Sequence, residues 1–333
     1  MRGRAAAKVS DSSAGGTVEN LVRDALRSLV FILGPHRSGT TLLYEMMAAG
    51  GSFNIVTARH VIHFDELRRS TNGRGPDRQR LRERFDRLGI SSRQVDRVGA
   101  TPDTPEEYGF LLDNAGGGVS LTMRNFPLFQ RICETVQGNH GLDRPLLLKN
   151  PWDFGHGDTI RTLLPDCRFV YIHRNPLHVL SSLYRFVTEA VAHPSAYLSL
   201  LSDRYRLFVE SEFPLRAARL VCGRGPRWLA KAMIYHTARL ASGYLRSISK
   251  FPSEARIDIH YETLCSSPNA TMSAILAHAG VAGGLCDYQA MIHVNPLRVA
   301  DEIAAEADLV LTKLTPYAAA VGYDLRRLVA AVT

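Results

Sequence analysis

The sequence predicts an α/β fold in which a parallel sheet lies between two layers of helices, and two observations support this prediction. Short apolar runs that favour β-strands recur along the chain, at residues 29–33, 145–149 and 167–172. Each run is followed by a turn containing glycine or proline and then by a stretch with helical spacing. Alternation of strands and helices is typical of a parallel sheet covered by helices on both faces.

The first strand leads into a glycine-rich loop. Residues 34–41 read Gly-Pro-His-Arg-Ser-Gly-Thr-Thr, and apolar residues follow at helical spacing from Leu42 onward. A strand, a glycine loop and a helix in this order direct backbone N–H groups at an anion. The loop nearly matches the pattern G-x4-G-K-[ST], but Thr40 stands in place of the lysine and Arg37 is its only cation. It therefore predicts a site for a phosphate-like group other than Mg-ATP.

Two later strands also end in residues suited to an anion. The strand at 145–148 brings Lys149 to its carboxyl end, where Pro151 turns the chain. The strand at 167–172 is followed by His-Arg174-Asn-Pro, and Ser182 lies on the next helix. The carboxyl ends of parallel strands share one edge of a sheet. We therefore expect these side chains to lie in the same crevice as the glycine loop.

The charge of the chain is uneven. The formal net charge is +8, and residues 68–97 hold ten arginines but only four acidic residues. Such a segment suits an anionic partner, and its arginines would favour an acidic acceptor, although a charge run is more often a solvated face. Phe85 is the only aromatic residue in it, so nucleic-acid binding by base stacking is not expected.

Cysteine usage and hydropathy indicate the class of protein. The five cysteines are widely spaced and form no C-x-x-C pair, which favours reduced thiols in a cytosol over a disulfide framework or a cysteine zinc site. No apolar run approaches the length needed to cross a membrane. We expect a cytoplasmic protein without membrane insertion, with a flexible tail at 1–18 and a single domain at 19–333. The sequence does not indicate an oligomeric state.

The rest of the chain supplies a helical insertion and the closing elements. We expect a short strand at 53–56 and a helical insertion over the sheet at 60–110, which shapes the acceptor pocket. Residues 314–324 are expected to form a loop and a final turn. The remaining predictions are helices at 18–29, 77–88, 158–164 and 228–250, a helix starting near residue 108, and a strand at 255–260.

Taken together, the motifs resemble those of the sulfotransferases that use 3′-phosphoadenosine 5′-phosphosulfate (PAPS), in particular the bacterial and tyrosylprotein-type branch. That family has a loop of the form P-[KR]-S-G-T-T after its first strand, and here one residue, His36, is inserted before the cation. Its second motif is R-[DN]-P with a serine eight residues after the arginine, as in Arg174 and Ser182. Weaker matches are L-K-x-P at 148–151 and Y-E-x-L at 261–264.

The resemblance implies a P-loop-like sulfotransferase fold and assigns residues to the donor. The loop would bind the 5′-phosphosulfate, Arg174 and Ser182 would bind the 3′-phosphate, and Tyr261 would lie near the adenine. Arg37 and Lys149 would act in catalysis. The loop residues assigned to donor binding are Gly34, His36, Arg37, Ser38, Gly39, Thr40, Thr41 and Leu42. The expected reaction moves a sulfonate to a hydroxyl or amine of a small-molecule or glycan acceptor, without a metal ion.

The chain also departs from the family pattern. Asn150 and Pro151 stand where the cytosolic animal enzymes have a catalytic histidine after the lysine, and a tryptophan after the loop is replaced by Leu42. No R-K-G motif is found, and Arg298 or Lys313 are the candidates to replace it. In the tyrosylprotein-type branch the general base lies roughly twenty residues past the loop.

That distance leads to four candidate bases: His60, His63, Asp65 and Glu66. We favour a histidine, since an ordinary carboxylate with a pKa of about 4 is a weak base toward a hydroxyl group. His60 is preferred over His63 because it lies nearer the end of the preceding strand. The alternatives to a sulfotransferase are a P-loop kinase or hydrolase and a basic nucleic-acid-binding protein.

Overall fold

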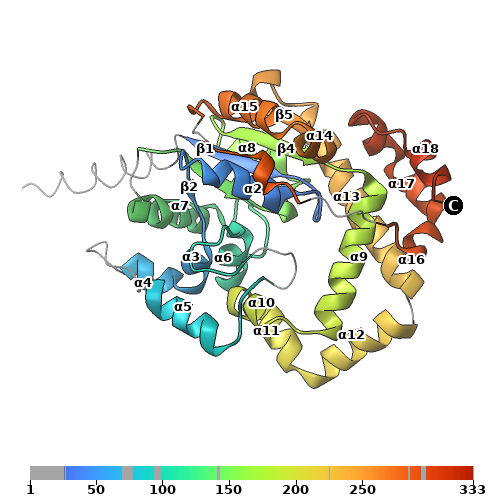
Figure 1. The fold of residues 1–333 in the computed structure, drawn as a ribbon, viewed down its shortest axis with the longest axis horizontal. Helices are drawn as coiled ribbons and strands as arrows, with labels where there is room; N and C mark the ends of the chain where they lie inside the picture. The colour runs from blue at the N-terminus through green and yellow to red at the C-terminus, as the bar shows by residue number, and fades with distance from the viewer. Residues whose placement is uncertain are drawn as a thin grey trace, which may run out of the picture.

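The computed structural model describes residues 26, 28–69, 78–93, 99–140, 143–224, 226–283, 286–293 and 298–332. Its centre is a sheet of five parallel strands in the order β2-β3-β1-β4-β5. The strands are β1 (Leu29–Leu33), β2 (Asn54–Ile55), β3 (Leu146–Lys149), β4 (Arg168–His173) and β5 (Arg256–His260). This sheet, covered by helices on both faces, confirms the predicted α/β class (Figure 1).

Strand β1 lies in the middle of the sheet because every one of its residues is apolar and buried. It pairs with β3 on one side and with β4 on the other. Successive side chains of a strand point to opposite faces. Accordingly Leu29, Phe31 and Leu33 pack in one apolar cluster, while Val30 and Ile32 pack in a second. A continuous apolar run is what a strand covered on both faces requires.

Three helices cover the face of the sheet to which Val30 and Ile32 point. They are α2 (Thr40–Ala49), α14 (Tyr261–Ser266) and α15 (Pro268–Ala279). Helices α6 (Tyr108–Asn114), α7 (Phe126–His140), α8 (Gly157–Leu163) and α13 (Pro226–Ile248) contribute to the cluster on the other face.

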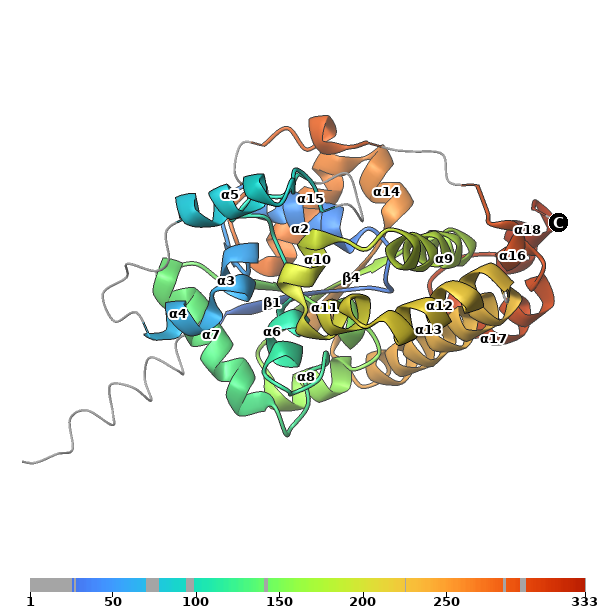
Figure 2. The same ribbon diagram turned by 90° about the horizontal axis from the view of Figure 1, so that it is seen from below.

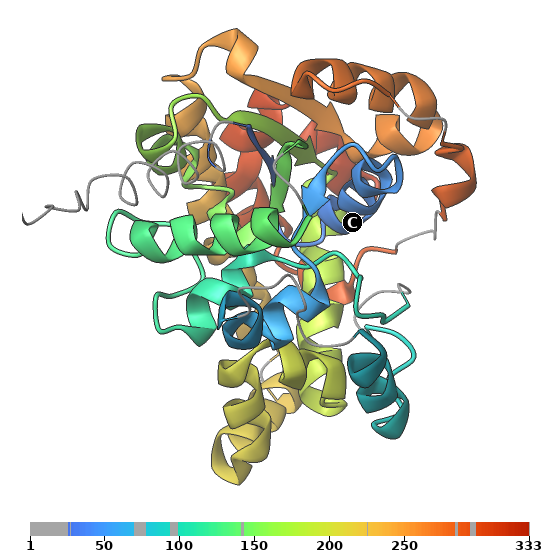
Figure 3. The ribbon, with the colours of Figure 1, turned by 90° about the vertical axis from the view of Figure 1, so that its left-hand side faces the viewer.

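A group of helices, yellow in Figure 3, lies at the end of the molecule opposite α15, which is orange. It includes α10 (Ala196–Leu201), α11 (Asp203–Glu210) and α12 (Glu212–Arg224). Helix α12 contacts both α9 (Pro176–Ala192) and α13, so the three run side by side (Figure 2). The C-terminal helices are α16 (Asp301–Ala304), α17 (Ala307–Ala320) and α18 (Leu325–Ala330).

The segment after β2 is helical, as expected for an insertion. It contains α3 (Ala58–Ile62), α4 (Phe64–Arg69) and α5 (Arg78–Arg87), while residues 70–77 and 94–98 lie outside the described part. Short 3₁₀ helices occur at η1 (Pro151–Asp153), η2 (Ser253–Ala255) and η3 (Gln289–Met291). Within the described ranges, no helix combines the length and the apolar character that crossing a membrane demands.

Two sequence expectations differ from the structure. The strand expected at 53–56 is only two residues long, Asn54–Ile55, and pairs with β3 alone at the edge of the sheet. The loop expected at 314–317 is wrong, because Pro316 lies inside α17. Leu314 and Tyr317 on either side of it are buried in the core, and this packing outweighs the helix-breaking tendency of proline. The expected tail at 1–18 lies outside the described residues, as does nearly all of the expected helix at 18–29.

The contact between α13 and Gly155, two residues after η1, predicts an unusual effect of a glycine-to-alanine substitution. In an exposed helix interior, alanine in place of glycine stabilises by about 1 kcal/mol. At Gly243 in α13 the added Cβ would instead clash with the backbone of Gly155. We expect Gly243→Ala to lower the free energy of unfolding by about 1–3 kcal/mol, measured by urea denaturation.

Gly138 in α7 is the matched control, since it is exposed and an added Cβ would meet nothing within 4 Å. Gly138→Ala should raise the free energy of unfolding. Equal stabilisation by both substitutions would show that the close approach of Gly155 to α13 does not constrain the fold.

Candidate functional site

The loop between β1 and α2 is held in an unusual backbone conformation. Gly39 has a φ of 101°, and Arg37 has a φ of 71°, which makes it the only non-glycine residue with positive φ in the described chain. The Ser38 N–H donates to the carbonyl of Pro35 at 3.1 Å, closing a turn. Strain of this kind persists only where the surroundings enforce it and is concentrated at functional sites. In this conformation the loop joins the carboxyl end of β1 directly to the N-terminus of the ten-residue helix α2.

Both ends of the loop require glycine because other residues come very close. A Cβ on Gly34 would lie 2.6 Å from the carbonyl oxygen of Ile172 on β4. A Cβ on Gly39 would clash with the ring of Tyr261. The buried Ser38 hydroxyl has no hydrogen-bond partner among the described residues. A buried polar group without a partner is costly, so this hydroxyl fits a ligand that supplies the missing bond.

Lys149 enters the site from the end of β3. Its side chain is fully buried, and its Nζ donates to Thr41 Oγ1 at 3.1 Å and pairs with Glu107 Oε1 at 2.7 Å. The ammonium group also lies 5.6 Å from the ring centre of Tyr44. A buried cation must be paired, and here the partners come from α2 and from the residue preceding α6. The structure thus brings Lys149 to the loop, as the sequence predicted.

Arg174 and Ser182 lie next to the loop as well. The Arg37 Nε donates to Ser182 Oγ at 3.1 Å, and Arg174 donates to the carbonyl of Arg37 at 3.2 Å. Arg174 also stacks over the ring of Tyr261 at 4.1 Å. Its buried Nε has no partner within the described ranges, so the guanidinium keeps a donor for a ligand. The three strand ends therefore form one continuous cationic site.

A cavity of about 240 Å³ opens beside the loop. Arg37, Thr40 and Thr41 line it on the loop side, together with His36, the extra residue of the loop. Burial lowers the pKa of His36 to about 4, so its ring is neutral at pH 7. Leu42 points instead into the apolar packing beneath α2.

Glu107 lines the same cavity, and sequence reasoning missed it. It reaches the site because residues 102–106 bond to the chain just after β2. The Glu106 N–H donates to the carbonyl of Val56 at 2.9 Å, and Thr57 pairs with Pro105 in an antiparallel bridge. A carboxylate directly before an apolar helix, after two prolines, was the only signal in the sequence, and it indicates a helix start rather than a site.

The two histidines favoured from the sequence lie elsewhere. His60 is buried and caps its own helix, since its Nδ1 accepts from the backbone N–H of Thr57 at 3.1 Å. His63 pairs with Glu66 at 3.2 Å and lines a different cavity, together with Asp65. None of the four candidate bases lines the cavity beside the loop.

A second buried carboxylate supports Glu107. Glu106 accepts from the Tyr197 hydroxyl at 2.5 Å and pairs with Arg93 at 3.3 Å. The same Arg93 guanidinium lies 3.6 Å from Glu107 Oε2. Burial, and then the neighbouring Glu107 carboxylate, raise the pKa of Glu106 to about 8. Lys149 and Arg93 hold the pKa of Glu107 well below its usual range.

The other candidate cations are not among the residues that line the cavity. The arginines of α5 are exposed, and Arg78 pairs with Asp103 at 2.8 Å, so this helix presents a solvated face. Lys313 stacks on Tyr235 of α13, whereas the segment of Arg298 lies against α9, which carries Ser182. The Arg298 carbonyl accepts from Arg185, and the Ala300 N–H donates to Ser181 Oγ at 3.0 Å. In the part of the chain that the structure describes, no three or more His, Cys, Asp or Glu side chains are grouped as metal ligands would be.

Comparison with known proteins identifies a family. A sequence profile described as the sulfotransferase family matches residues 29–283 of this chain. The match includes β1 and its loop, Lys149, Arg174 and Tyr261. No curated protein sequence matches the chain.

Two solved structures share the fold. Sulfotransferase STF9 from Mycobacterium avium is 15% identical, with a TM-score of 0.66 over 93% of this chain and 81% of that one. Sulfotransferase STF1 from Mycobacterium tuberculosis H37Rv is 16% identical, with a TM-score of 0.54 over 91% of this chain and 80% of that one. At this level of sequence identity, the similarity shows a shared fold and nothing more.

The raised pKa of Glu106 predicts a pH dependence of stability. Between about pH 5 and 8 the folded protein keeps a proton on Glu106 that the unfolded chain releases, so stability falls as the pH rises through this range. Glu106→Gln removes this proton uptake. We expect the free energy of unfolding to fall more steeply with pH in the parent, by up to about 1.4 kcal/mol per pH unit. Identical slopes for the two proteins would show that Glu106 is ionised throughout this range.

Proposed function

The chain belongs to the sulfotransferase family, and on that premise we propose that it transfers a sulfonate group from PAPS to a hydroxyl group of a small-molecule acceptor. One observation carries this proposal: the carboxyl ends of β1, β3 and β4 bring an anion-binding loop, Lys149 and the Arg174–Ser182 pair together. A donor with a phosphosulfate at one end and a second phosphate nearby needs such a continuous set of cations and N–H groups.

The loop and α2 would hold the 5′-phosphate of the donor. The first N–H groups of a helix have no partner inside the helix and carry a partial positive charge. The unpartnered Ser38 hydroxyl adds a further hydrogen bond at the same place. Arg174 and Ser182 would hold the 3′-phosphate, and Tyr261, stacked on Arg174, lies where it would flank the adenine.

The transfer is an in-line displacement at sulfur, related to phosphoryl transfer. The acceptor oxygen forms a bond to sulfur, while the bond from sulfur to the 5′-phosphate oxygen breaks and leaves its electron pair on that oxygen. Negative charge grows on the bridging and sulfonate oxygens, and fixed cations stabilise it. We assign this role to Arg37, which lines the cavity, and to Lys149, which lies behind the cavity wall and contacts Thr41 of the loop.

The acceptor proton must go to a base within hydrogen-bond reach. We assign this role to Glu107 in place of His60, since Glu107 lines the cavity next to Thr41 and His60 does not. Its contact with Lys149 at 2.7 Å holds the carboxylate ionised and oriented. A carboxylate is a weak base toward a free hydroxyl, but the hydroxyl proton becomes strongly acidic as its oxygen bonds to sulfur, and a weak base then suffices. The proton that leaves the acceptor hydroxyl is then taken up by Glu107.

The donor assignment is tested by nucleotide binding. Two charge-assisted contacts to the 3′-phosphate contribute about 1.5–3 kcal/mol each. We expect adenosine 3′,5′-bisphosphate to bind more than about a hundredfold tighter than adenosine 5′-monophosphate in calorimetry, and Arg174→Ala to reduce this difference by about tenfold or more.

Arg80→Ala on the exposed face of α5 is the matched control and should leave both affinities unchanged. Titrations with ATP-Mg and with an oligonucleotide belong to the same experiment. Tighter binding of ATP-Mg would indicate a kinase or hydrolase, and tighter binding of the oligonucleotide would indicate a nucleic-acid-binding protein.

The assignment of Glu107 predicts a loss of turnover. Glu107→Gln keeps the shape of the side chain but cannot accept the proton, so kcat should fall by about 10²–10⁴ with nucleotide affinity nearly unchanged. Because the pKa of Glu107 lies below its usual range, kcat/KM should not fall between pH 7 and 5, as it would with a histidine base.

Glu66→Gln is the control for this substitution, since Glu66 lies outside the cavity beside the loop. It should turn over like the parent. An active Glu107→Gln protein together with an inactive His60→Ala protein would return the base to His60.

A further inference from the structure

We propose that the acceptor is a small, uncharged aromatic alcohol, and this inference rests on the function proposed above. It follows from the walls of the cavity that begins at Glu107 and the loop. Four aromatic side chains line it, each half-buried and each from a different element. They are Phe110 of α6, Trp152 of η1, Phe186 of α9 and Tyr205 of α11.

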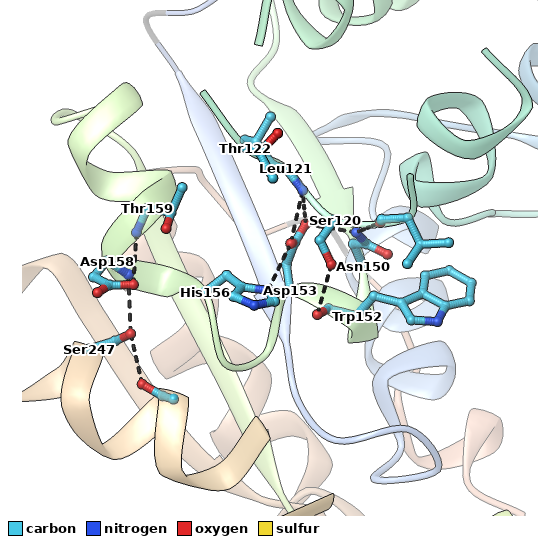
Figure 4. A network of polar contacts seen from close by, with 12 residues as sticks. Ser120, Leu121, Thr122, Asn150, Trp152, Asp153, His156, Asp158, Thr159 and Ser247 are labelled. Carbon is cyan, nitrogen blue, oxygen red and sulfur yellow. Dashed lines mark hydrogen bonds and ion pairs between the residues drawn. The ribbon is translucent and has the colours of Figure 1, made fainter. Parts of the chain in front are cut away.

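Trp152 is held in place and forms a fixed wall. Its ring centre lies 5.1 Å from that of His36 and 5.4 Å from that of Phe110, both in edge-to-face geometry. Its carbonyl accepts from the Ser120 hydroxyl at 3.2 Å. Figure 4 shows its indole pointing away from Asp153. Gly109 keeps this place open, because a Cβ there would lie 2.8 Å from the indole. A flat surface that is already ordered binds a ring without further loss of side-chain freedom.

Hydrogen bonds of Asp153 and Asn150 hold the backbone of η1 in place as well. Asp153 is fully buried and accepts from the Asn150 side chain at 2.7 Å and from the Leu121 N–H at 3.0 Å (Figure 4). Asn150 also donates to the carbonyl of Val119 at 2.8 Å. These bonds fix the backbone on either side of Trp152.

The polar side chains on the helical side of the cavity, Tyr205 and Ser202, are engaged within the protein. The Tyr205 hydroxyl donates to the carbonyl of Ala190 at 3.0 Å and accepts from the Ser195 N–H at 3.1 Å. Ser202 accepts from the N–H of Tyr205 at 3.1 Å. A sugar would bring several hydroxyls into this cavity and leave most of them without partners. A ring with a single hydroxyl needs only the contact to Glu107.

Charge and size restrict the acceptor further. Arg93 pairs with Glu106 and Glu107, and Arg37, which contacts Ser182 and Phe186, is the cation assigned to the sulfonate of the donor, so neither cation is left for an acidic acceptor. An acidic acceptor is therefore not favoured, in contrast to the expectation from the arginine-rich segment. The volume of about 240 Å³ is below the range of about 300–1,000 Å³ common for drug-sized ligands, which suits an acceptor of one or two rings.

The test compares acceptors by calorimetry, with and without adenosine 3′,5′-bisphosphate. The probes are 2-naphthol, its saturated counterpart decahydro-2-naphthol, and glucose. We expect 2-naphthol to bind about tenfold tighter than the saturated alcohol and glucose to show no binding at millimolar concentration. With labelled PAPS, 2-naphthol should also be the best of the three acceptors.

Variants at the two tryptophans of the chain provide the matched comparison. Trp152→Ala should weaken 2-naphthol binding by about tenfold, while Trp152→Phe, which keeps a ring, should weaken it less. Trp228→Ala, on the exposed start of α13, should leave it unchanged. Phe110→Ala provides a second wall variant if Trp152→Ala melts below the parent.

The outcomes separate this inference from the proposed function. Tighter binding of glucose than of 2-naphthol, or a folded Trp152→Ala protein that binds 2-naphthol like the parent, would overturn the aromatic acceptor and leave the donor assignment intact. Failure of the bisphosphate to bind, with 2-naphthol binding still dependent on Trp152, would overturn the donor and support the aromatic cavity.

Discussion

The buried ammonium group of Lys149 is the constraint on which the site depends. A charge that is removed from water must have partners, and its partners Glu107 and Thr41 belong to two other segments. These contacts therefore connect the end of β3 to α2, the helix after the glycine loop, and to residues 102–107, which bond to the chain just after β2. The segments that meet at Lys149 supply the loop and the carboxylate of the proposed transfer, and the Arg174–Ser182 pair joins them through Arg37.

The carboxylates of Glu107 and Glu106 connect Lys149 to the helices that cover the sheet. Arg93 joins Glu107 to Glu106, and Glu106 accepts from Tyr197 on α10. Removal of any member would leave a buried charge or donor unpaired. The orientation of Glu107 thus depends on side chains that lie behind it, away from the cavity.

The cavity has walls of two kinds. Strand termini, a helix N-terminus and paired charges form the loop wall, a combination that suits an anionic donor. Aromatic side chains form the other walls, and they meet the loop where Trp152 contacts His36 and Phe186 contacts Arg37. The proposed acceptor would have its hydroxyl group at Glu107 and its ring among the aromatic walls.

The sequence by itself determined the sheet and the anion-binding end of the site. Runs such as Leu29–Leu33 are local signals, and the residues that follow each strand must meet at one edge of a parallel sheet. The proposed base and the proposed acceptor walls became visible only in the tertiary structure. His60 has the right distance along the chain, yet it caps its own helix, and Glu107 arrives through pairing of residues 102–106 with the chain after β2. Likewise Phe110, Trp152, Phe186 and Tyr205 share no spacing in the sequence, because packing between four separate elements brings them together.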